Sequence, residues 1–223
     1  MSLRLLPWLA WLAYLAGCLL ILENTVRDFR PGGDGVFIEQ RGAIGENPIW
    51  LTTLYLHILA GLICLFSALP QFSRKIIRSW PSLHRVAGRA YVVSVLLVLC
   101  PTGFYLGLYA KGGFLGKLGF LTLAVASFHT TVVALRAVVG DRRNLAAHQV
   151  WMIRSFALAA SAVSFRIFHA IGYLMMIDDT VNYVCGIWLS ILVNLAVAEL
   201  IIHRGTSLQA SLKLQPSQSP TSI

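Results

Sequence analysis

Apolar residues run through this chain in six long blocks that are separated by short polar connections. Each block is long enough for a helix to cross a hydrocarbon core about 30 Å thick, and none alternates apolar and polar residues as barrel strands do. We therefore predict an all-α integral membrane bundle of six helices. The predicted spans cover about residues 5–23, 50–70, 86–109, 114–139, 149–177 and 181–203.

The composition agrees with this pattern and excludes a water-soluble globule. Of the 223 residues, 57% are hydrophobic and 12% are charged, whereas a soluble domain has about 25% charged residues. A chain of this length has no room for six spans and a separate catalytic domain, so we predict a single bundle over residues 1–206. Residues 207–223 are polar and rich in Ser, Gln and Pro, and we expect this tail to be disordered.

The formal charge of +9 reflects membrane topology. Lys and Arg cluster at the ends of the apolar runs rather than on one solvated face, so we expect no nucleic-acid partner. The positive-inside rule places the basic connections and both termini in the cytoplasm, most simply at a bacterial inner membrane, where anionic headgroups meet the basic connections. Seven of the nine acidic residues fall on the other side: Glu23, Asp28, Asp34, Glu39, Glu46, Asp178 and Asp179.

Histidines inside or at the ends of the spans are candidate ligands, because ionisable groups in hydrocarbon are costly and usually face a partner. His57 lies in the second span, His129 in the fourth and His169 in the fifth. His84 and His148 begin the third and fifth spans in similar segments, which indicates a duplicated helical hairpin. If the fifth span is straight, His148 and His169 lie about 31 Å apart on one polar face. Tight helix packing is the alternative explanation for His57, and headgroup binding for His84 and His148.

Arginines complete the set of candidate binding residues. Arg166 lies about 16 residues into the fifth span, and no span offers it a central carboxylate. We interpret it as the partner of an anionic or polar ligand, such as a haem propionate, a quinone oxygen or a lipid phosphate. Hydrogen bonding to helix carbonyls is the alternative. Arg85, Arg89 and Arg154 follow His84 and His148 in the sequence and are further candidates.

Four stretches between residues 50 and 175 share a pattern with a known family. They are His57 through Gln71, His84-Arg85-x-x-Gly88-Arg89-x-Tyr91, Thr102-Gly103, and His148-x-x-Trp151-Met152-Ile153-Arg154-Ser155 continuing to Arg166. Together they resemble the predicted multi-spanning membrane proteins known as domain of unknown function 2306. This resemblance implies a membrane bundle but no activity.

A more distant resemblance is to the two-haem b-type cytochromes of the transmembrane ascorbate ferrireductase kind. These proteins have six spans and one ligand His on each of the second to fifth, which here are His57, His84, His129 and His148. The resemblance implies that His57 pairs with His129 and His84 with His148. By depth alone, His84 and His148 form the only pair on the cytoplasmic side, while His57 could instead pair with His169.

Three functions fit these residues. We favour a b-type haem protein that transfers electrons across or within the membrane, as an oxidoreductase or carrier with a quinone or another redox partner. A second hypothesis is a non-catalytic subunit that assembles or stabilises a larger membrane complex. A third is a transporter of an anion or small solute past Arg166, His169 and His129, although the spans lack the mid-depth carboxylates typical of cation coupling.

Overall fold

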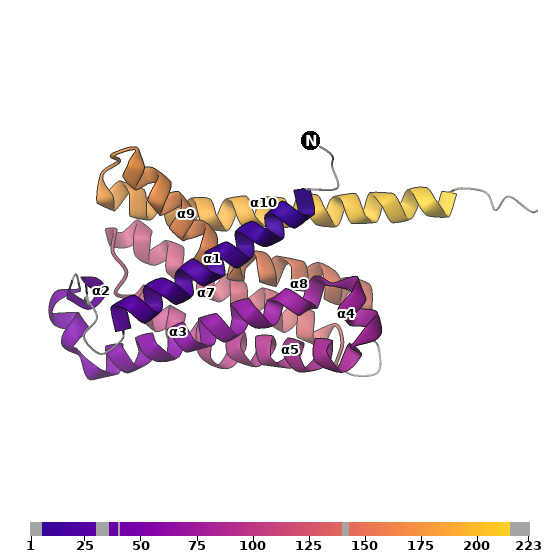
Figure 1. The fold of residues 1–223 in the computed structure, drawn as a ribbon, viewed down its shortest axis with the longest axis horizontal. Coiled ribbons are helices and arrows are strands. Elements are labelled where there is room, and N and C mark those ends of the chain that lie inside the picture. The colour runs from indigo at the N-terminus through magenta and orange to yellow at the C-terminus, as the bar shows by residue number, and fades with distance from the viewer. Residues whose placement is uncertain (1–5, 30–35, 40, 140–142, 215–223) are drawn as a thin grey trace, which may run out of the picture.

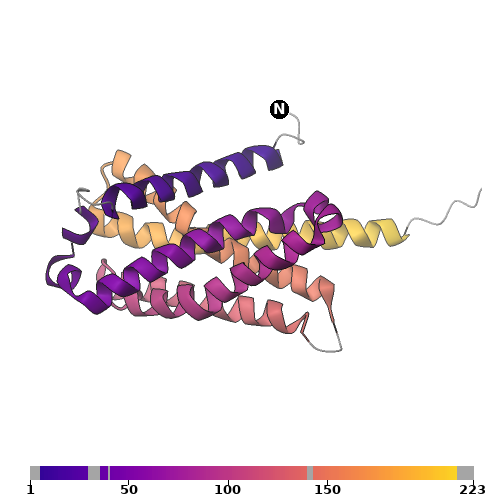
Figure 2. The ribbon, with the colours of Figure 1, turned by 60° about the horizontal axis from the view of Figure 1, so that its bottom comes forward.

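Antiparallel helices make up the computed structural model, which describes residues 6–29, 36–39, 41–139 and 143–214 and contains no strand in those ranges. The predicted all-α membrane bundle is confirmed (Figure 1, Figure 2). The elements are α1 (Leu6–Phe29), α2 (Val36–Glu39), η1 (Gly42–Glu46), α3 (Pro48–Ala68), η2 (Leu69–Phe72), α4 (Arg74–Ser79), α5 (Pro81–Val93), η3 (Ser94–Leu99), α6 (Cys100–Gly107), α7 (Gly113–Arg136), α8 (Leu145–Ala159), α9 (Ser161–Leu174) and α10 (Asp179–Leu214).

Within the part of the chain that the structure describes, five stretches of helix are long and apolar enough to cross a membrane. They are Pro48–Phe72, Pro81–Gly107, Gly113–Arg136, Leu145–Leu174 and Asp179–Gly205. These correspond to the second to sixth predicted spans, and the largest difference is at the third, which begins at Pro81 rather than at residue 86. The first predicted span corresponds to α1, a long helix that packs against α3 and α9.

The connections between the helices gather at the two ends of the bundle (Figure 1), and these ends differ in charge. One end, which we call the basic end, holds the α3–α5 and α7–α8 connections, with Lys75, Arg78, Arg136 and Arg143. The opposite end holds the α6–α7 and α9–α10 connections, and Asp178 lies there. At the basic end, α10 continues to Leu214, so the helix includes the first part of the predicted tail; residues 215–223 lie outside the described residues.

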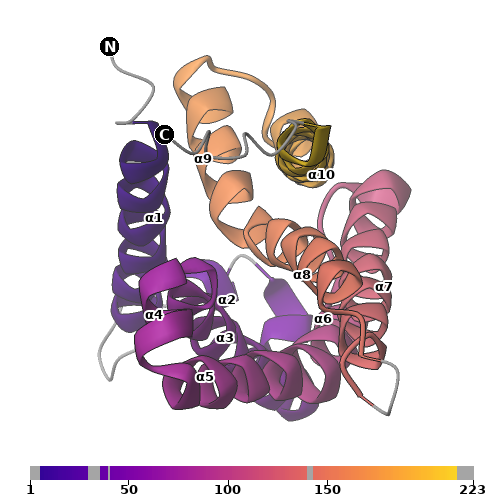
Figure 3. The ribbon, with the colours of Figure 1, turned by 90° about the vertical axis from the view of Figure 1, so that its right-hand side faces the viewer.

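Four spans form a ring around the core: α3, the span made of α5, η3 and α6, then α7, and then α8. Helix α3 packs against α5, η3 and α6; α6 packs against α7; α7 packs against α8; and α8 meets α3 again. Helices α5 and α8 therefore stand diagonally across this ring, as α3 and α7 do. Helix α10 packs outside the ring against α7, α8 and α9 (Figure 3). Facing helices of such a ring can present ligands to one another across the bundle core.

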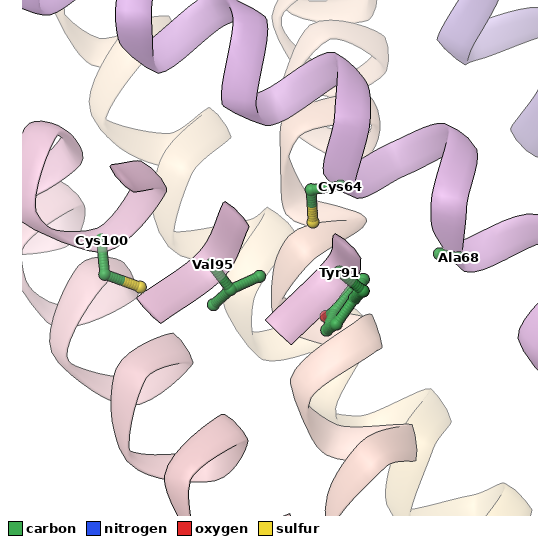
Figure 4. Packing of buried hydrophobic residues seen from close by; sticks show 5 residues of the cluster. All are labelled: Cys64, Ala68, Tyr91, Val95 and Cys100. Atoms are coloured by element: carbon green, nitrogen blue, oxygen red, sulfur yellow. The ribbon is translucent and has the colours of Figure 1, made fainter. Parts of the chain in front are cut away.

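Small residues let α3 approach α5 closely. Cys64 and Ala68 of α3 pack against Tyr91 of α5, Val95 of η3 and Cys100 of α6, and all five are buried (Figure 4). Cys64 and Ala68 follow His57 at helical spacing and so lie on the same face of α3. This face therefore serves tight helix packing, the alternative explanation for His57.

The third span contains a π-helical turn, η3, directly before Pro101. Proline has no N–H to donate to the carbonyl four residues earlier, here that of Leu97, and helices often widen where this bond is missing. The Thr102 hydroxyl donates to the carbonyl of Val98 at 2.5 Å and so supplies a side-chain donor in this region. Pro101 thus explains why the irregularity lies at this depth.

The fifth predicted span is not one straight helix. It is divided at Ala160 into α8 and α9, which point in different directions (Figure 3). The N–H of Val163 donates to the Ala160 carbonyl, three residues back, so the turn here is tighter than in an α-helix. The polar face from His148 to His169 therefore bends, and the straight-helix separation of about 31 Å is an upper limit.

Replacing Gly172 with Ala should destabilise the α9–α10 packing. A Cβ at Gly172 would clash with the Asn182 amide, which donates to the carbonyl of His169 at 2.9 Å. We expect Gly172→Ala to lose about 1–3 kcal/mol in the free energy of unfolding. Gly61→Ala is the matched control, because its nearest neighbour would be a Leu99 methyl at an ordinary 3.6 Å. Equal thermal unfolding midpoints for the two variants in detergent would contradict this packing.

Candidate functional site

His84 and His148 occupy equivalent positions at the basic end. Helix α5 begins at Pro81 and helix α8 at Leu145, so each His is the fourth residue of its helix. The side chain of Asn144 accepts from the N–H of Ala147 at 2.9 Å and caps α8. Pro81 fixes the first turn of α5. These start signals set the positions of both histidines, as the similarity of the two segments predicts.

The hydrogen bond of His148 fixes its tautomer. Its Nδ1 lies 2.8 Å from the carbonyl oxygen of Ala134 on α7. A carbonyl can only accept, so Nδ1 carries the hydrogen and Nε2 of the neutral ring keeps its lone pair. A ring held through Nδ1–H is the usual arrangement of histidines that bind metal through Nε2.

His84 has a buried ring nitrogen without a partner. Its Nδ1 atom is inaccessible and makes no hydrogen bond with any described residue. Its backbone carbonyl accepts from the Gln71 amide at 3.1 Å, and the missing side chain of Gly88 leaves space for that amide. His84 and His148 lie in the first turns of α5 and α8, at the same end of the bundle. An unsatisfied buried polar atom in a native fold needs an explanation, and a ligand between these rings would provide one.

Arg85 and Arg89 are both exposed on α5, four residues apart and thus on one side of the helix. They carry positive charge beside His84. Such a pair can bind propionate or phosphate groups.

Arg154 has a carboxylate partner within the protein. Its Nε donates to Glu199 at 2.6 Å and its Nη2 at 3.0 Å, which joins α8 to α10. The guanidinium also lies 4.6 Å from the centroid of the Trp151 ring. This side chain is therefore engaged without any ligand.

His57 lies against the irregular part of the third span. Its Nδ1 is 3.0 Å from the Thr102 hydroxyl oxygen, and because that hydroxyl donates to Val98, Nδ1 is the donor. A Cβ at Gly103 would come within 2.9 Å of the His57 ring. Gly103 therefore makes room for the imidazole itself, and Nε2 keeps its lone pair.

The two predicted partners of His57 have other neighbours. His129 is exposed and meets Trp151 edge to face, with ring centroids 5.8 Å apart. His169 lies 3.7 Å from the Asp179 carboxylate and contacts Phe165. Among the described residues no hydrogen bond or ring contact joins either of them to His57. The pairing of His57 thus stays a prediction.

Arg166 hydrogen-bonds to its own helix. Its Nη1 donates to the Ala162 carbonyl at 2.8 Å, one turn earlier. This is the carbonyl bonding that we considered as the alternative to a ligand. Most of the Arg166 donors have no acceptor among the residues that the structure describes, so a role in binding a further group stays a prediction.

The sequence did not predict a buried network of three hydroxyl groups that the structure shows. Tyr91 of α5 bonds Ser155 of α8 at 2.9 Å, and Ser155 bonds Thr131 of α7 at 2.7 Å. All three side chains are buried. Tyr91 belongs to the motif that begins at His84, and Ser155 to the motif that begins at His148. The sequence alone does not show that residues of two separate motifs are in contact. This network links the two helices that carry His84 and His148.

The comparisons with known proteins identify a family. A family described as 'Predicted membrane protein (DUF2306)' matches residues 54–202, which is more than half of the chain. The chain belongs to the DUF2306 family. The match starts in α3 and ends in α10, so it covers the five candidate spans and not α1. No curated protein and no solved structure matches the chain, so the resemblance to two-haem cytochromes has no support from relatives.

The Arg154–Glu199 pair can be tested by a double-mutant cycle. Arg154→Leu or Glu199→Leu alone leaves the other charge unpaired at a surface within the spans, and each should cost about 1–3 kcal/mol in the free energy of unfolding. The double variant should recover part of this loss, because neither charge remains. Arg85→Leu, at an exposed site on α5, is the control. Additive losses in the double variant would contradict a direct interaction.

Proposed function

We propose that this protein is a b-type haem electron carrier whose haem lies between His84 and His148 at the basic end. The observation that carries the proposal is the buried, unbonded Nδ1 of His84, which lies in the first turn of α5 as His148 lies in the first turn of α8, at the same end of the bundle. Coordination through this nitrogen would give it a partner, and because the atom is inaccessible the His84 ring would first have to turn and expose it. A bound haem iron supplies one-electron chemistry, changing between its ferrous and ferric forms.

The residues around this pair include groups that would help to hold a haem. The two histidines lie on α5 and α8, which stand diagonally across the ring of helices. About two helical turns further into the bundle, Tyr91 and Ser155 bridge α5 and α8 through their hydroxyls. The Ala134 carbonyl orients the His148 ring, and Arg85 and Arg89 offset negative charge at the membrane surface. These arginines would bind haem propionates or anionic headgroups.

The other two hypotheses have weaker support. An anion pathway past Arg166, His169 and His129 would have an acidic group beside it, because His169 faces Asp179. A non-catalytic subunit needs no unsatisfied ligand, so it leaves the His84 nitrogen unexplained. We therefore place a redox partner ahead of a larger complex as the expected interaction.

Loss of either histidine should remove the haem. We expect the purified full-length protein, produced with ample haem, to give a b-type reduced-minus-oxidised absorption spectrum. His84→Ala and His148→Ala should each reduce haem per polypeptide to background, because each removes one of the two imidazoles that would hold it. His203→Ala is the matched control and should keep its haem. Circular dichroism of each variant separates haem loss from unfolding. A colourless preparation of the parent protein would overturn the proposal.

The orientation of the bundle is a second part of the proposal. We propose that the basic end faces the cytoplasm of a bacterial cell, because Lys and Arg in short connections are retained on that side. Both chain termini would then be cytoplasmic.

Reporter fusions test this orientation. A fusion after Arg78 should report the cytoplasm, and one after Asp178 should report the other side. An enzyme active only outside the cytoplasm and a fluorescent protein active only inside give opposite readouts at each position. A cytoplasmic signal at Asp178 would contradict the proposed topology.

A further inference from the structure

Four polar and aromatic side chains form a row on the outer surface of α7, α8 and α10. His129 meets Trp151 at a centroid distance of 5.8 Å. Arg154 lies 4.6 Å from the centre of the Trp151 ring and makes two hydrogen bonds to Glu199. We call these four residues the polar row. Three helices contribute to it, so it exists only in the folded bundle.

The polar row faces outward from the bundle. His129 is exposed, and the side chains of Arg154 and Glu199 keep 25% and 52% of their accessible surface. All of these residues belong to candidate membrane spans. Neither nitrogen of His129 hydrogen-bonds to a described residue. An imidazole N–H exposed to hydrocarbon is unfavourable, so a molecule that hydrogen-bonds to it from the bilayer would be favoured.

The depth of the polar row indicates which molecule this is. Along the helix axes, His129 lies about 10 Å from Arg136 and Glu199 about 9 Å from Gly205, at the basic ends of their spans. Arg154 lies about 14 Å from the start of α8. A phospholipid headgroup lies at the level of the helix ends. A polar ring that dissolves in hydrocarbon reaches the row without leaving its preferred environment.

We infer that the polar row binds the ring of a lipid-soluble quinone that enters from the bilayer. The N–H of His129 can donate to a quinone oxygen. Each oxygen of Glu199 has a lone pair left beside its bond from Arg154, so it can accept from a hydroxyl of the reduced form. Trp151 supplies aromatic contact, and Val125 and Phe128 of α7, which are both exposed, supply apolar contact for the tail.

The choice of a redox-active ring rests on the proposed haem. Trp151 follows His148 by three residues on α8, which is a rise of about 4.5 Å. Trp151 of the polar row therefore lies about one helical turn from His148, one of the two proposed haem ligands. A quinone bound there would be a neighbour of the haem on the same helix.

A binding titration tests this inference without using the haem. The full-length protein in lipid nanodiscs is titrated with decyl-benzoquinone, and quenching of tryptophan fluorescence reports binding. The parent should saturate, and His129→Ala should bind about tenfold more weakly, because it loses one hydrogen bond. His203→Ala is the matched control and should bind like the parent. Decylbenzene, which lacks the oxygens, should not give saturable quenching.

The outcomes distinguish this inference from the haem proposal. Saturable binding that depends on His129 in a colourless preparation supports the quinone site and overturns the haem. A normal haem spectrum with equal affinities for His129→Ala and His203→Ala overturns the quinone site alone. Native mass spectrometry tests whether a second copy of the chain, rather than a quinone, occupies the polar row. If it detects a dimer that His129→Ala dissociates, the polar row is an interface between copies and the inference fails.

Discussion

The hydrocarbon interior of a bilayer offers no hydrogen bonds, so each polar group in a spanning helix must find its partner within the protein or its ligands. This constraint determines which helices adjoin. Tyr91, Ser155 and Thr131 connect α5, α8 and α7 through their hydroxyls. The side-chain amide of Asn194 on α10 donates to the carbonyl of Ala157 on α8 at 3.0 Å. The bundle is held together by such contacts as well as by the fit of small residues.

The same constraint divides the charged residues into those the protein satisfies and those it leaves available. Arg154 is neutralised by Glu199 and Arg166 donates to a helix carbonyl, so neither depends on a ligand for all of its bonding. The Nδ1 of His84 and the exposed ring of His129 have no such partner among the described residues. These two groups lie toward the same end of the bundle. They carry the proposals of haem and quinone binding for this reason.

Irregular helices position the remaining candidates. The π-helical turn before Pro101 brings Thr102 and Gly103 against His57. The break at Ala160 directs α9 away from the line of α8, toward α1 and α10. His169 consequently lies beside Asp179 rather than on one straight face with His148. A helix that changes direction inside a span changes which residues can meet.

The sequence by itself determined the membrane bundle, the positions of five spans to within a few residues and the equivalence of His84 and His148. These features depend on local patterns: the length of an apolar run, the charges that flank it and the residues that start a helix. The sequence could not show that Glu199 neutralises Arg154, that the fifth span breaks at Ala160, or that His129 faces outward. Each of these depends on contacts between residues far apart in the chain. Only the tertiary structure decided them, because the rotation of each helix about its axis is set by its neighbours.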